Sequence, residues 1–231
     1  MFVMNIAVIL SGGKGTRLNN AIPKQYIQVT DKWIIEYCLD TFQAHQMVDG
    51  FIIVAEKEWQ GHLDERIGKK YSKLLGFADA GSSRQASILS GLTKIREMTL
   101  DVDYIIIHDA ARPNLSKNLI TACFQELIRA DGVMPVLPVK DTIYFSEKGK
   151  TIGSLLNRDQ LFAGQAPEGF LFDKYLALHE GLSDLELSGI RGSSEIAFKN
   201  GLTVNLIPGE ESNYKITTIE DLNKFKLENG E

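Results

Sequence analysis

Residues 11–26, SGGKGTRLNNAIPKQY, combine the chemical types that bind phosphate groups. Three of the first five are glycines: Gly12, Gly13 and Gly15. Glycine accepts positive φ angles and lets backbone N–H groups approach a ligand closely. Arg17 and Lys24 add two positive charges, and Pro23 restricts the backbone immediately before the lysine. We therefore expect this segment to bind a polyphosphate.

Two familiar phosphate-binding motifs do not fit this segment. A dinucleotide fingerprint that starts at Gly13 needs a small third residue, and Leu18 occupies that position. A Walker loop ends in Gly-Lys-Ser/Thr, whereas the lysine here stands between glycines. A plain tight turn stays open as an alternative, because it explains the glycines, although it leaves the basic residues unexplained.

A second candidate is HDAARP, residues 108–113, which follows an apolar run. An aspartate at a strand end, facing a triphosphate, is suited to Mg²⁺, which favours one or two carboxylates plus phosphate oxygens. We therefore expect Asp109 to be a magnesium ligand, and Arg112 adds a bidentate anion donor nearby. The alternative is that Asp109 only caps the next turn. His108 has no visible partner and is given no functional role.

Other polar segments carry weaker signals. GSSRQAS, residues 81–87, could close over a nucleobase with its backbone and Ser87, but serine-rich turns are also common helix caps. Three further positions are weak when taken singly, because isolated polar residues are usually solvated: Thr142, Arg158 and Lys215.

The elements that would position these residues alternate between strands and helices. Short apolar runs predict strands at residues 5–10, 50–55, 76–80, 103–107, 133–139 and 203–207. Helical patterns cover residues 33–45, 84–94, 117–130 and 172–181, and a last helix is expected to be capped by Thr218. Strands that are apolar on both faces, separated by helices, indicate an α/β fold with a mostly parallel sheet covered on both sides.

The candidate segments stand at strand exits. Residues 11–17, 81–84 and 108–113 each follow a predicted strand. In a parallel sheet the carboxyl ends of the strands lie along one edge, where ligands bind. We therefore expect the three segments to converge on one site.

After Asp141 the alternation of strands and helices breaks. Residues 142–156 contain two short runs around a polar turn, which predicts a protruding hairpin. Such a hairpin is either a surface flap or an arm that embraces a second subunit. Because the sequence has no Pro/Ser-rich linker and no internal repeat, we interpret residues 1–231 as one domain with an arm at about residues 140–160.

Composition limits the class of protein. The 231-residue chain is 44% hydrophobic and 24% charged, as in a globular protein. Its net charge of −5 gives no global attraction to nucleic acid or to an anionic membrane, so neither is expected as a partner. Cys38 and Cys123 stand far apart without a CxxC pair, and we expect buried free thiols and a cytoplasmic location. The apolar N-terminal run is too short to span a bilayer and is interpreted as a first strand.

Across nearly the whole chain, the motifs occur in an order that resembles one enzyme family: SGGKGTRL, PKQY, GSSRQAS, HDAARP, VKDT, NRDQLFAGQAP and NYKITTIEDL. This is the family of cytidylyltransferases that make CDP-activated polyols, from 2-C-methyl-D-erythritol 4-phosphate or from ribitol 5-phosphate. The resemblance implies a Rossmann-like nucleotidyltransferase fold, a homodimer with interlocking arms, and Mg²⁺ as cofactor. It also implies the reaction of CTP with a polyol phosphate to give a CDP-polyol and pyrophosphate.

The resemblance further implies roles for individual residues. Three would bind the triphosphate and stabilise the transition state: Arg17, Lys24 and Lys215. Ten would form the nucleotide site, with Asp109 also holding Mg²⁺: Leu10, Ser11, Gly12, Gly13, Gly15, Gly81, Ser82, Ser87, Asp109 and Ala110. Three would bind the polyol phosphate, the last two from the arm of a partner subunit: Arg112, Thr142 and Arg158.

Different motifs of this chain resemble different branches of the family, and the two branches use different polyol phosphates. SGGKGTR, NRDQLFAGQ and ESNYKITT are closer to the ribitol branch and HDAARP to the methylerythritol branch, so D-ribitol 5-phosphate is the preferred expectation. The chain departs from both branches at residues 165–167, Gln-Ala-Pro for the usual Gln-Thr-Pro, and at residues 191–195, RGSSE, where the usual Thr-Asp pair is missing. That pair normally touches the polyol phosphate, and we expect Arg191, Ser193 and Ser194 to take over its contact.

Two other classes of protein stay open. One is a nucleotidyltransferase for another nucleotide and sugar phosphate, whose sequence usually differs from PKQY after the glycine-rich opening. The other is a nucleotide-binding homologue without turnover, which would have no need to retain the four charged residues of the site: Arg17, Lys24, Asp109 and Lys215.

Overall fold

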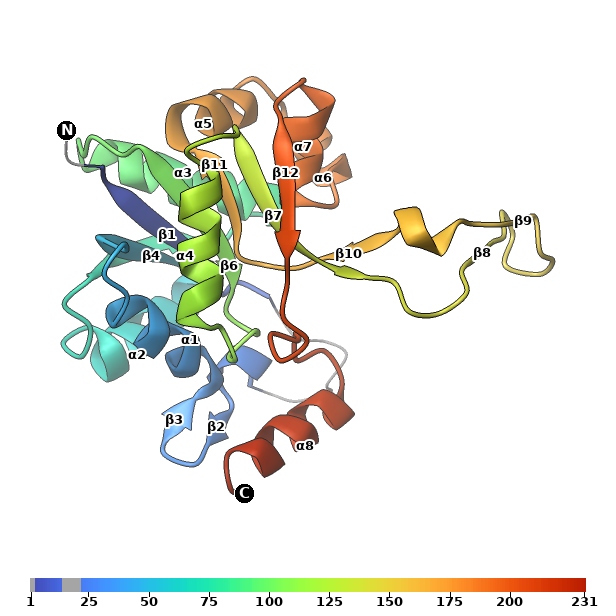
Figure 1. Cartoon of the computed structure of the whole chain (residues 1–231). Helices are drawn as coiled ribbons and strands as arrows, with labels where there is room; N and C mark the ends of the chain where they lie inside the picture. Colours follow the sequence, from blue (N-terminus) through green and yellow to red (C-terminus); the bar gives the residue numbers. More distant parts are fainter. Residues whose placement is uncertain (1–2, 14–21) are drawn as a thin grey trace.

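The structure, a computed structural model, describes residues 3–13 and 22–231. Within these residues, eight strands form one sheet in the order β10-β7-β11-β6-β1-β4-β5, with β12 paired to β7 (Figure 1). The bounds of these strands are β1 Asn5–Leu10, β4 Gly50–Ala55, β5 Leu74–Asp79, β6 Tyr104–Asp109, β7 Gly132–Pro138, β10 Phe162–Gly164, β11 Glu168–Leu171 and β12 Val204–Pro208.

Most of the sheet is parallel, as the alternating pattern predicts. β1 pairs in parallel with β4 and β6, β4 pairs with β5, and β7 pairs with β12. The antiparallel strands are β10 and β11, and β11 lies between β6 and β7. Because β11 is antiparallel to both of its neighbours, β6 and β7 still point the same way. The exits of β1, β4, β5, β6, β7 and β12 therefore share one edge of the sheet.

Helices cover both faces of the sheet, since successive side chains of a strand point to opposite faces. Ala7 and Ile9 of β1 pack in a core with three helices: α1 Ile34–Gln43, α2 Lys57–Ile67 and α4 Lys117–Glu126. Ile6 and Val8 pack in a second core with three others: α3 Arg84–Glu97, α5 Phe172–Glu180 and α7 Ser193–Lys199. The short helix α6, Asp184–Gly189, adjoins α3. The predicted α/β architecture with both faces covered is confirmed.

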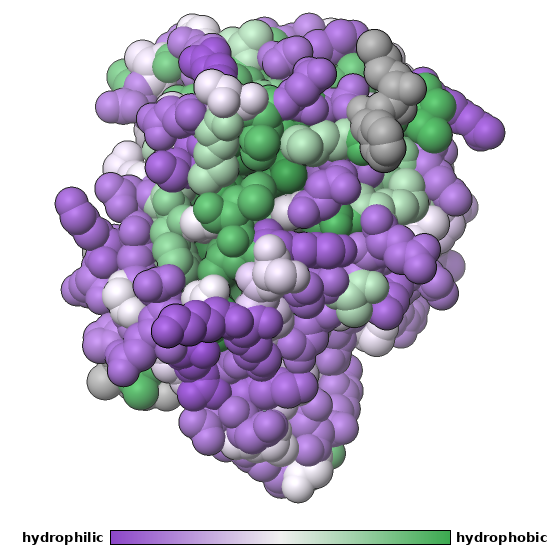
Figure 2. All heavy atoms as spheres, turned by 90° about the vertical axis from the view of Figure 1, so that its left-hand side faces the viewer, coloured by the Kyte–Doolittle hydropathy of each residue, from purple (hydrophilic) through white to green (hydrophobic). Residues whose placement is uncertain are grey.

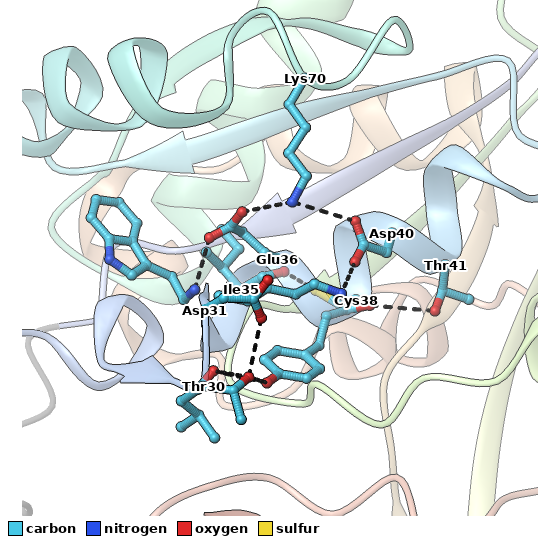
Figure 3. A network of polar contacts seen from close by, with 12 residues as sticks. Thr30, Asp31, Ile35, Glu36, Cys38, Asp40, Thr41 and Lys70 are labelled. Atoms are coloured by element: carbon cyan, nitrogen blue, oxygen red, sulfur yellow. Dashed lines mark hydrogen bonds and ion pairs between the residues drawn. The ribbon is translucent and has the colours of Figure 1, made fainter. Parts of the chain in front are cut away.

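A buried carboxylate joins α1 to α2. Glu36 of α1 is 3% exposed, and its carboxylate accepts hydrogen bonds from Arg66 Nε at 2.7 Å and from Lys70 Nζ at 2.8 Å. Figure 3 shows Lys70 between Glu36 and Asp40. Burial by itself would raise the pKa of Glu36, but these hydrogen bonds and one from the Trp33 backbone bring it below its usual value. The network therefore stabilises the packing of α2 and the turn after it against α1.

A third, smaller core holds the C-terminal helix. α8, Ile219–Glu228, contributes Leu222 and Phe225, which pack with Val29 of a small hairpin, β2 Gln28–Val29 and β3 Lys32–Trp33. Thr218 caps α8 as expected, because its side chain accepts a hydrogen bond from Asp221 N at 3.2 Å. The chain between β12 and α8 thereby returns to the strand exits.

Between β7 and β10 the chain leaves the sheet. A two-stranded hairpin, β8 Tyr144–Phe145 and β9 Ser154–Leu155, projects from the body of the molecule, and the short helix η3, Arg158–Gln160, follows it (Figure 1). This is the hairpin expected at residues 142–156. Its large apolar side chains are more than a third exposed, as is that of Phe162 at its base: Tyr144, Phe145, Ile152, Leu155 and Leu156.

The opposite edge of the sheet is β5. On the face of the molecule that is turned to the left in Figure 1, hydrophobic residues gather in a central band between hydrophilic regions (Figure 2). Leu75 of β5 is 36% exposed, and a Cβ on Gly50 of β4 would lie 2.6 Å from its side chain. Gly50 therefore lets the edge strand pack closely against its neighbour.

Several boundaries differ from the expected ones. The helix from Lys117 ends at Glu126 and not at residue 130, and residues 127–130 turn into β7. The helix from Arg84 runs on to Glu97. Strand β11 and helices α6 and α7 were not predicted. Cys38 and Cys123 are buried free thiols as expected, and within residues 3–13 and 22–231 no helix has the length and apolarity to cross a membrane.

Candidate active site

The expected convergence of strand exits is confirmed by one pocket of about 670 Å³. It is lined by Leu10, Gly12 and Gly13 after β1, by Gly81–Arg84 and Ser87 after β5, and by Asp109 at the end of β6. Its other lining residues come from two further loops and from the ends of nearby strands: Lys24, Gln25, Glu56, Ala80, Ala111, Lys215 and Thr217. Of the predicted residues, Gly15 and Arg17 lie outside the described residues.

Lys24 stands at the start of a short 3-10 helix, η2 Lys24–Tyr26, which holds the beginning of the glycine segment. The Gln25 side chain donates to the carbonyls of Ser11 at 2.6 Å and Gly13 at 3.0 Å, and Ser11 Oγ donates to the Tyr26 hydroxyl at 2.8 Å. A Cβ on Gly12 would lie 2.4 Å from Ala80 Cβ. The turn after β1 therefore requires glycine at position 12. The side chains of Gln25 and Tyr26 hold the turn in place, and Lys24 is next to them in the chain.

The GSSRQAS segment is a tight helix entry. Ser83 caps α3 by accepting from Ala86 N at 3.1 Å, and Gly81 N donates to Ser87 Oγ at 3.0 Å. A Cβ on Gly81 would lie 2.6 Å from the Ala86 carbonyl carbon. Both interpretations of this segment are thus compatible with the structure, because the residues cap a helix and also line the pocket.

Asp109 is the charged centre of the site. Its Oδ1 lies 3.3 Å from Arg84 Nη2, and its Oδ2 lies 2.9 Å from Lys215 Nζ and 3.7 Å from Arg112 Nε. Burial by itself would raise the pKa of this carboxyl, but the three cations hold it well below its usual range. Asp109 is therefore ionised at neutral pH, with both oxygens facing cations.

Lys215 and Arg112 reach Asp109 from positions about a hundred residues apart in the chain. Ile216 N donates to Ala111 O at 2.8 Å, which fixes the NYKITT segment beside the HDAARP turn. Arg112 Nη1 donates to Asn213 O at 2.7 Å, and Arg112 lies outside the described pocket lining. Lys215 therefore faces the pocket, while Arg112 ties the two segments together beneath it.

His108 has a structural position. It is fully buried, and its Nε2 donates to the Arg112 carbonyl oxygen at 3.0 Å. Burial lowers the pKa of His108 to about 4, so the ring is neutral at pH 7 and stabilises the HDAARP turn.

The residues expected to bind the polyol phosphate lie in three places. Thr142 and Arg158 are exposed on the arm, and neither lines the pocket of its own chain. Arg191 is exposed at the start of α7. Ser193 is fully buried and its Oγ accepts a hydrogen bond from Arg84, while Ser194 donates to Glu168. The two serines therefore lie behind the pocket wall, and their contact with a substrate stays a prediction.

Sequence reasoning missed two residues: Arg84, which lines the pocket, and Glu168, which contacts Arg84 but does not line the pocket. Arg84 lies within the GSSRQAS motif, yet only its neighbours were assigned roles. Glu168 begins β11 and lies 3.6 Å from Arg84 Nη2. The only signal for Arg84 was a cation at a strand exit, and no local pattern pointed to Glu168.

Mg²⁺ can be tested against these residues. Among the described residues no cluster of three or more acidic, histidine or cysteine side chains could hold a metal ion alone. The pocket instead offers two carboxylates, that of Asp109, which is ionised, and that of Glu56, beside Lys24, Lys215 and the backbone after β1. This donor set fits Mg²⁺ that shares its coordination with phosphate oxygens, as Mg²⁺ usually does.

Fold and site together define an α/β nucleotidyltransferase, with basic side chains and glycines around one pocket at the strand exits. Residues 5–227 match the sequence model of a family described as 2-C-methyl-D-erythritol 4-phosphate cytidylyltransferase. The chain belongs to this family of cytidylyltransferases, and the resemblance seen in the motifs is confirmed.

Relatives with two different names match along their whole length. The 2-C-methyl-D-erythritol 4-phosphate cytidylyltransferase of Lachnospira eligens is 32% identical over 222 residues, covering 95% of this chain and 96% of the relative. The ribitol-5-phosphate cytidylyltransferase of Streptococcus agalactiae serotype Ia is 26% identical over 225 residues, covering 96% and 94%. The preference for ribitol phosphate is therefore not supported, because relatives with the methylerythritol name have the higher identity.

A solved structure confirms the fold. The 4-diphosphocytidyl-2C-methyl-D-erythritol synthase of Anaerococcus prevotii superposes with a TM-score of 0.83 over 99% of this chain and 97% of that one, at 24% identity. The expected Rossmann-like nucleotidyltransferase architecture is thus the observed one.

Proposed function

We propose that this protein transfers CMP from CTP to 2-C-methyl-D-erythritol 4-phosphate. An oxygen of the polyol phosphate attacks the α-phosphorus of CTP in line, the bond from that phosphorus to the β-phosphate bridging oxygen breaks, and pyrophosphate leaves. The observation that carries the proposal is Asp109 with Lys215 and Arg84 at the strand exits, next to a glycine turn and Lys24. In such transfers positioning and charge neutralisation supply most of the catalysis.

Different parts of the pocket have different roles in this proposal. The backbone at Gly12 and Gly13, with Lys24, binds the triphosphate, and Lys215 neutralises charge that develops at the α-phosphate. The turn from Gly81 to Ser87 recognises cytosine with backbone groups. Mg²⁺, when bound by Asp109 and phosphate oxygens, adds positive charge where negative charge accumulates.

The polyol phosphate is proposed to bind beside the triphosphate with help from a second subunit. Thr142 and Arg158 stand on the exposed arm, so they would complete the site of a partner in a homodimer. The exposed apolar side chains of the arm support this proposal, because contiguous exposed apolar surface marks interaction sites. The two buried free thiols, Cys38 and Cys123, are compatible with a cytoplasmic enzyme.

Ribitol 5-phosphate is the second candidate, supported by relatives of that name at 26% identity. The experiment is pyrophosphate release from CTP and Mg²⁺, with 2-C-methyl-D-erythritol 4-phosphate and D-ribitol 5-phosphate compared at equal concentration. A higher kcat/KM with the first supports the proposal, and a higher value with the second replaces it. UTP, ATP and GTP in place of CTP test the class of another nucleotidyltransferase. If no pyrophosphate is released with any pair of nucleotide and polyol phosphate, the protein is a nucleotide-binding homologue without turnover.

A further inference from the structure

Arg84 is shared between two carboxylates. Its Nη2 lies 3.3 Å from Asp109 Oδ1 and 3.6 Å from Glu168 Oε1, and its Nη1 donates to Ser193 Oγ. All three partners are buried, at 9%, 8% and 0% exposure for Asp109, Glu168 and Ser193. A guanidinium carries five donors in a fixed fork, so a small rotation can take it away from Asp109 while Glu168 and Ser193 remain its partners.

The start of α7 holds the second carboxylate in place. Ser194 donates to Glu168 Oε2 from its backbone N at 3.0 Å and from its Oγ at 2.6 Å. Ser193 O accepts from the Tyr175 hydroxyl at 3.0 Å, and Gly192 O accepts from Gln85 Nε2 at 3.0 Å. Glu168 and Ser193 are therefore held in place as a pair of acceptors for Arg84.

A divalent cation at Asp109 needs one of two oxygens that already face cations. Oδ2 faces Lys215 and Arg112, and Oδ1 faces Arg84. Among the described residues, Arg84 is the one of these three cations that forms an ion pair with a second carboxylate, and a guanidinium left without a partner in a buried site would be costly. We propose that Glu168 and Ser193 receive Arg84 when a divalent cation binds Asp109, so that Oδ1 is freed for the metal. This inference rests on the proposed function.

The proposal gives the RGSSE segment a different task from the one expected from sequence. Ser193 and Ser194 act as positioning residues through Arg84 and Glu168, in place of a direct contact with the polyol phosphate. The segment then controls metal binding at the nucleotide and leaves the choice of polyol to other residues.

The test measures binding without turnover. CTP is titrated calorimetrically into the full-length protein, with Mn²⁺ as the metal probe or with EDTA and no polyol phosphate. In Glu168→Gln, the CTP affinity in EDTA should stay within about twofold, whereas the gain in affinity that Mn²⁺ provides should fall about fivefold, as for loss of one charge pair. In Ser193→Ala, which changes no charge, the gain in CTP affinity that Mn²⁺ provides should fall about threefold. Ser188→Ala, an exposed serine on the neighbouring helix α6, is the matched control and should leave the gain unchanged.

A double-mutant cycle separates an effect of Glu168 that is transmitted through Arg84 from a direct electrostatic effect of the Glu168 carboxylate on the metal. In the Arg84→Met background, Glu168→Gln should cause no further loss of the Mn²⁺-dependent gain. If it still causes the full loss, Glu168 acts on the metal through space and the proposal is overturned. Wild-type protein that binds CTP with Mn²⁺, together with variants that match it, also overturns the proposal but leaves the proposed function intact. Wild-type protein that binds no CTP overturns both, and thermal unfolding of each variant confirms that it is folded.

Discussion

Replacing Lys215 by methionine removes the ammonium that lies 2.9 Å from Asp109 Oδ2 while keeping most of the length of the side chain. The Lys215 side chain is 37% exposed, so its loss should cost the folded protein no more than about 1 kcal/mol. The backbone should stay in place, because Ile216 N is still bonded to Ala111 O. In the proposed mechanism, however, the lysine would neutralise charge in the transition state that the ground state lacks. Removing one such preorganised group costs about 10²–10³ in kcat, or ~3–4 kcal/mol.

The assay is steady-state pyrophosphate release over a matrix of CTP and polyol-phosphate concentrations. We expect kcat to fall by this factor while both KM values change less than about fivefold, the pattern of an interaction made mainly in the transition state. Lys69→Met is the control: this exposed lysine follows α2 and does not line the pocket. A Lys215→Met enzyme with unchanged kcat and a raised KM for CTP would refute the catalytic role, since the lysine would then serve ground-state binding alone.

Four further predictions concern other parts of the molecule. Glu36→Gln should lower the free energy of unfolding by about 1–3 kcal/mol in urea titrations at pH 7, because Arg66 and Lys70 lose their shared carboxylate. Hydrogen bonds lower the pKa of Glu36 against the effect of burial, so this stabilisation is present above the usual value of 4.5 and is lost as the pH falls below it. The two proteins should therefore converge in acid, and a constant difference would contradict the assignment. Gly12→Ala should weaken CTP binding about tenfold in calorimetry, since its Cβ would lie 2.4 Å from that of Ala80 and the loop must move. Phe145→Asp should give the mass of a monomer in light scattering, and a dimer of unchanged affinity would count against the arm as the interface. Arg158→Ala should raise the KM for the polyol phosphate and spare that for CTP, and the reverse pattern would mean that the two subsites are exchanged.

The sequence was sufficient for those features that follow from local patterns. Apolar runs predicted β1, β4 and β6, and the parallel arrangement then placed the glycine turn, the GSSRQAS turn and Asp109 at one edge. The cap of α8 at Thr218 and the hairpin of the arm followed from residue types within a few positions. In each case the determining interactions are close together in the chain.

The missed features depend on contacts between distant residues. Arg84 and Ser193 are 109 positions apart, and Arg84 and Glu168 meet only because β11 inserts between β6 and β7. β11 has four residues, too few to show a period, and its antiparallel direction follows from packing in the sheet. The polar run RGSSE was interpreted as a surface for ligand, whereas its first serine is fully buried and accepts a hydrogen bond from Arg84 at the start of α3. A short polar run at a helix start reads the same in sequence whether it faces solvent or a buried guanidinium.

The site also explains how a chain with net charge −5 can bind a polyanion. Around Asp109, three cations face two carboxylates, so this cluster carries a net charge of +1, and the pocket wall adds one basic side chain, Lys24, and one acidic side chain, Glu56. Without ligand, Asp109 neutralises Lys215 and keeps the cluster stable. In the proposed mechanism, the triphosphate would pair with Lys215, and a metal ion would pair with Asp109. Each of these ion pairs would then be exchanged for one with substrate or metal, which would keep the charges of the site paired throughout binding.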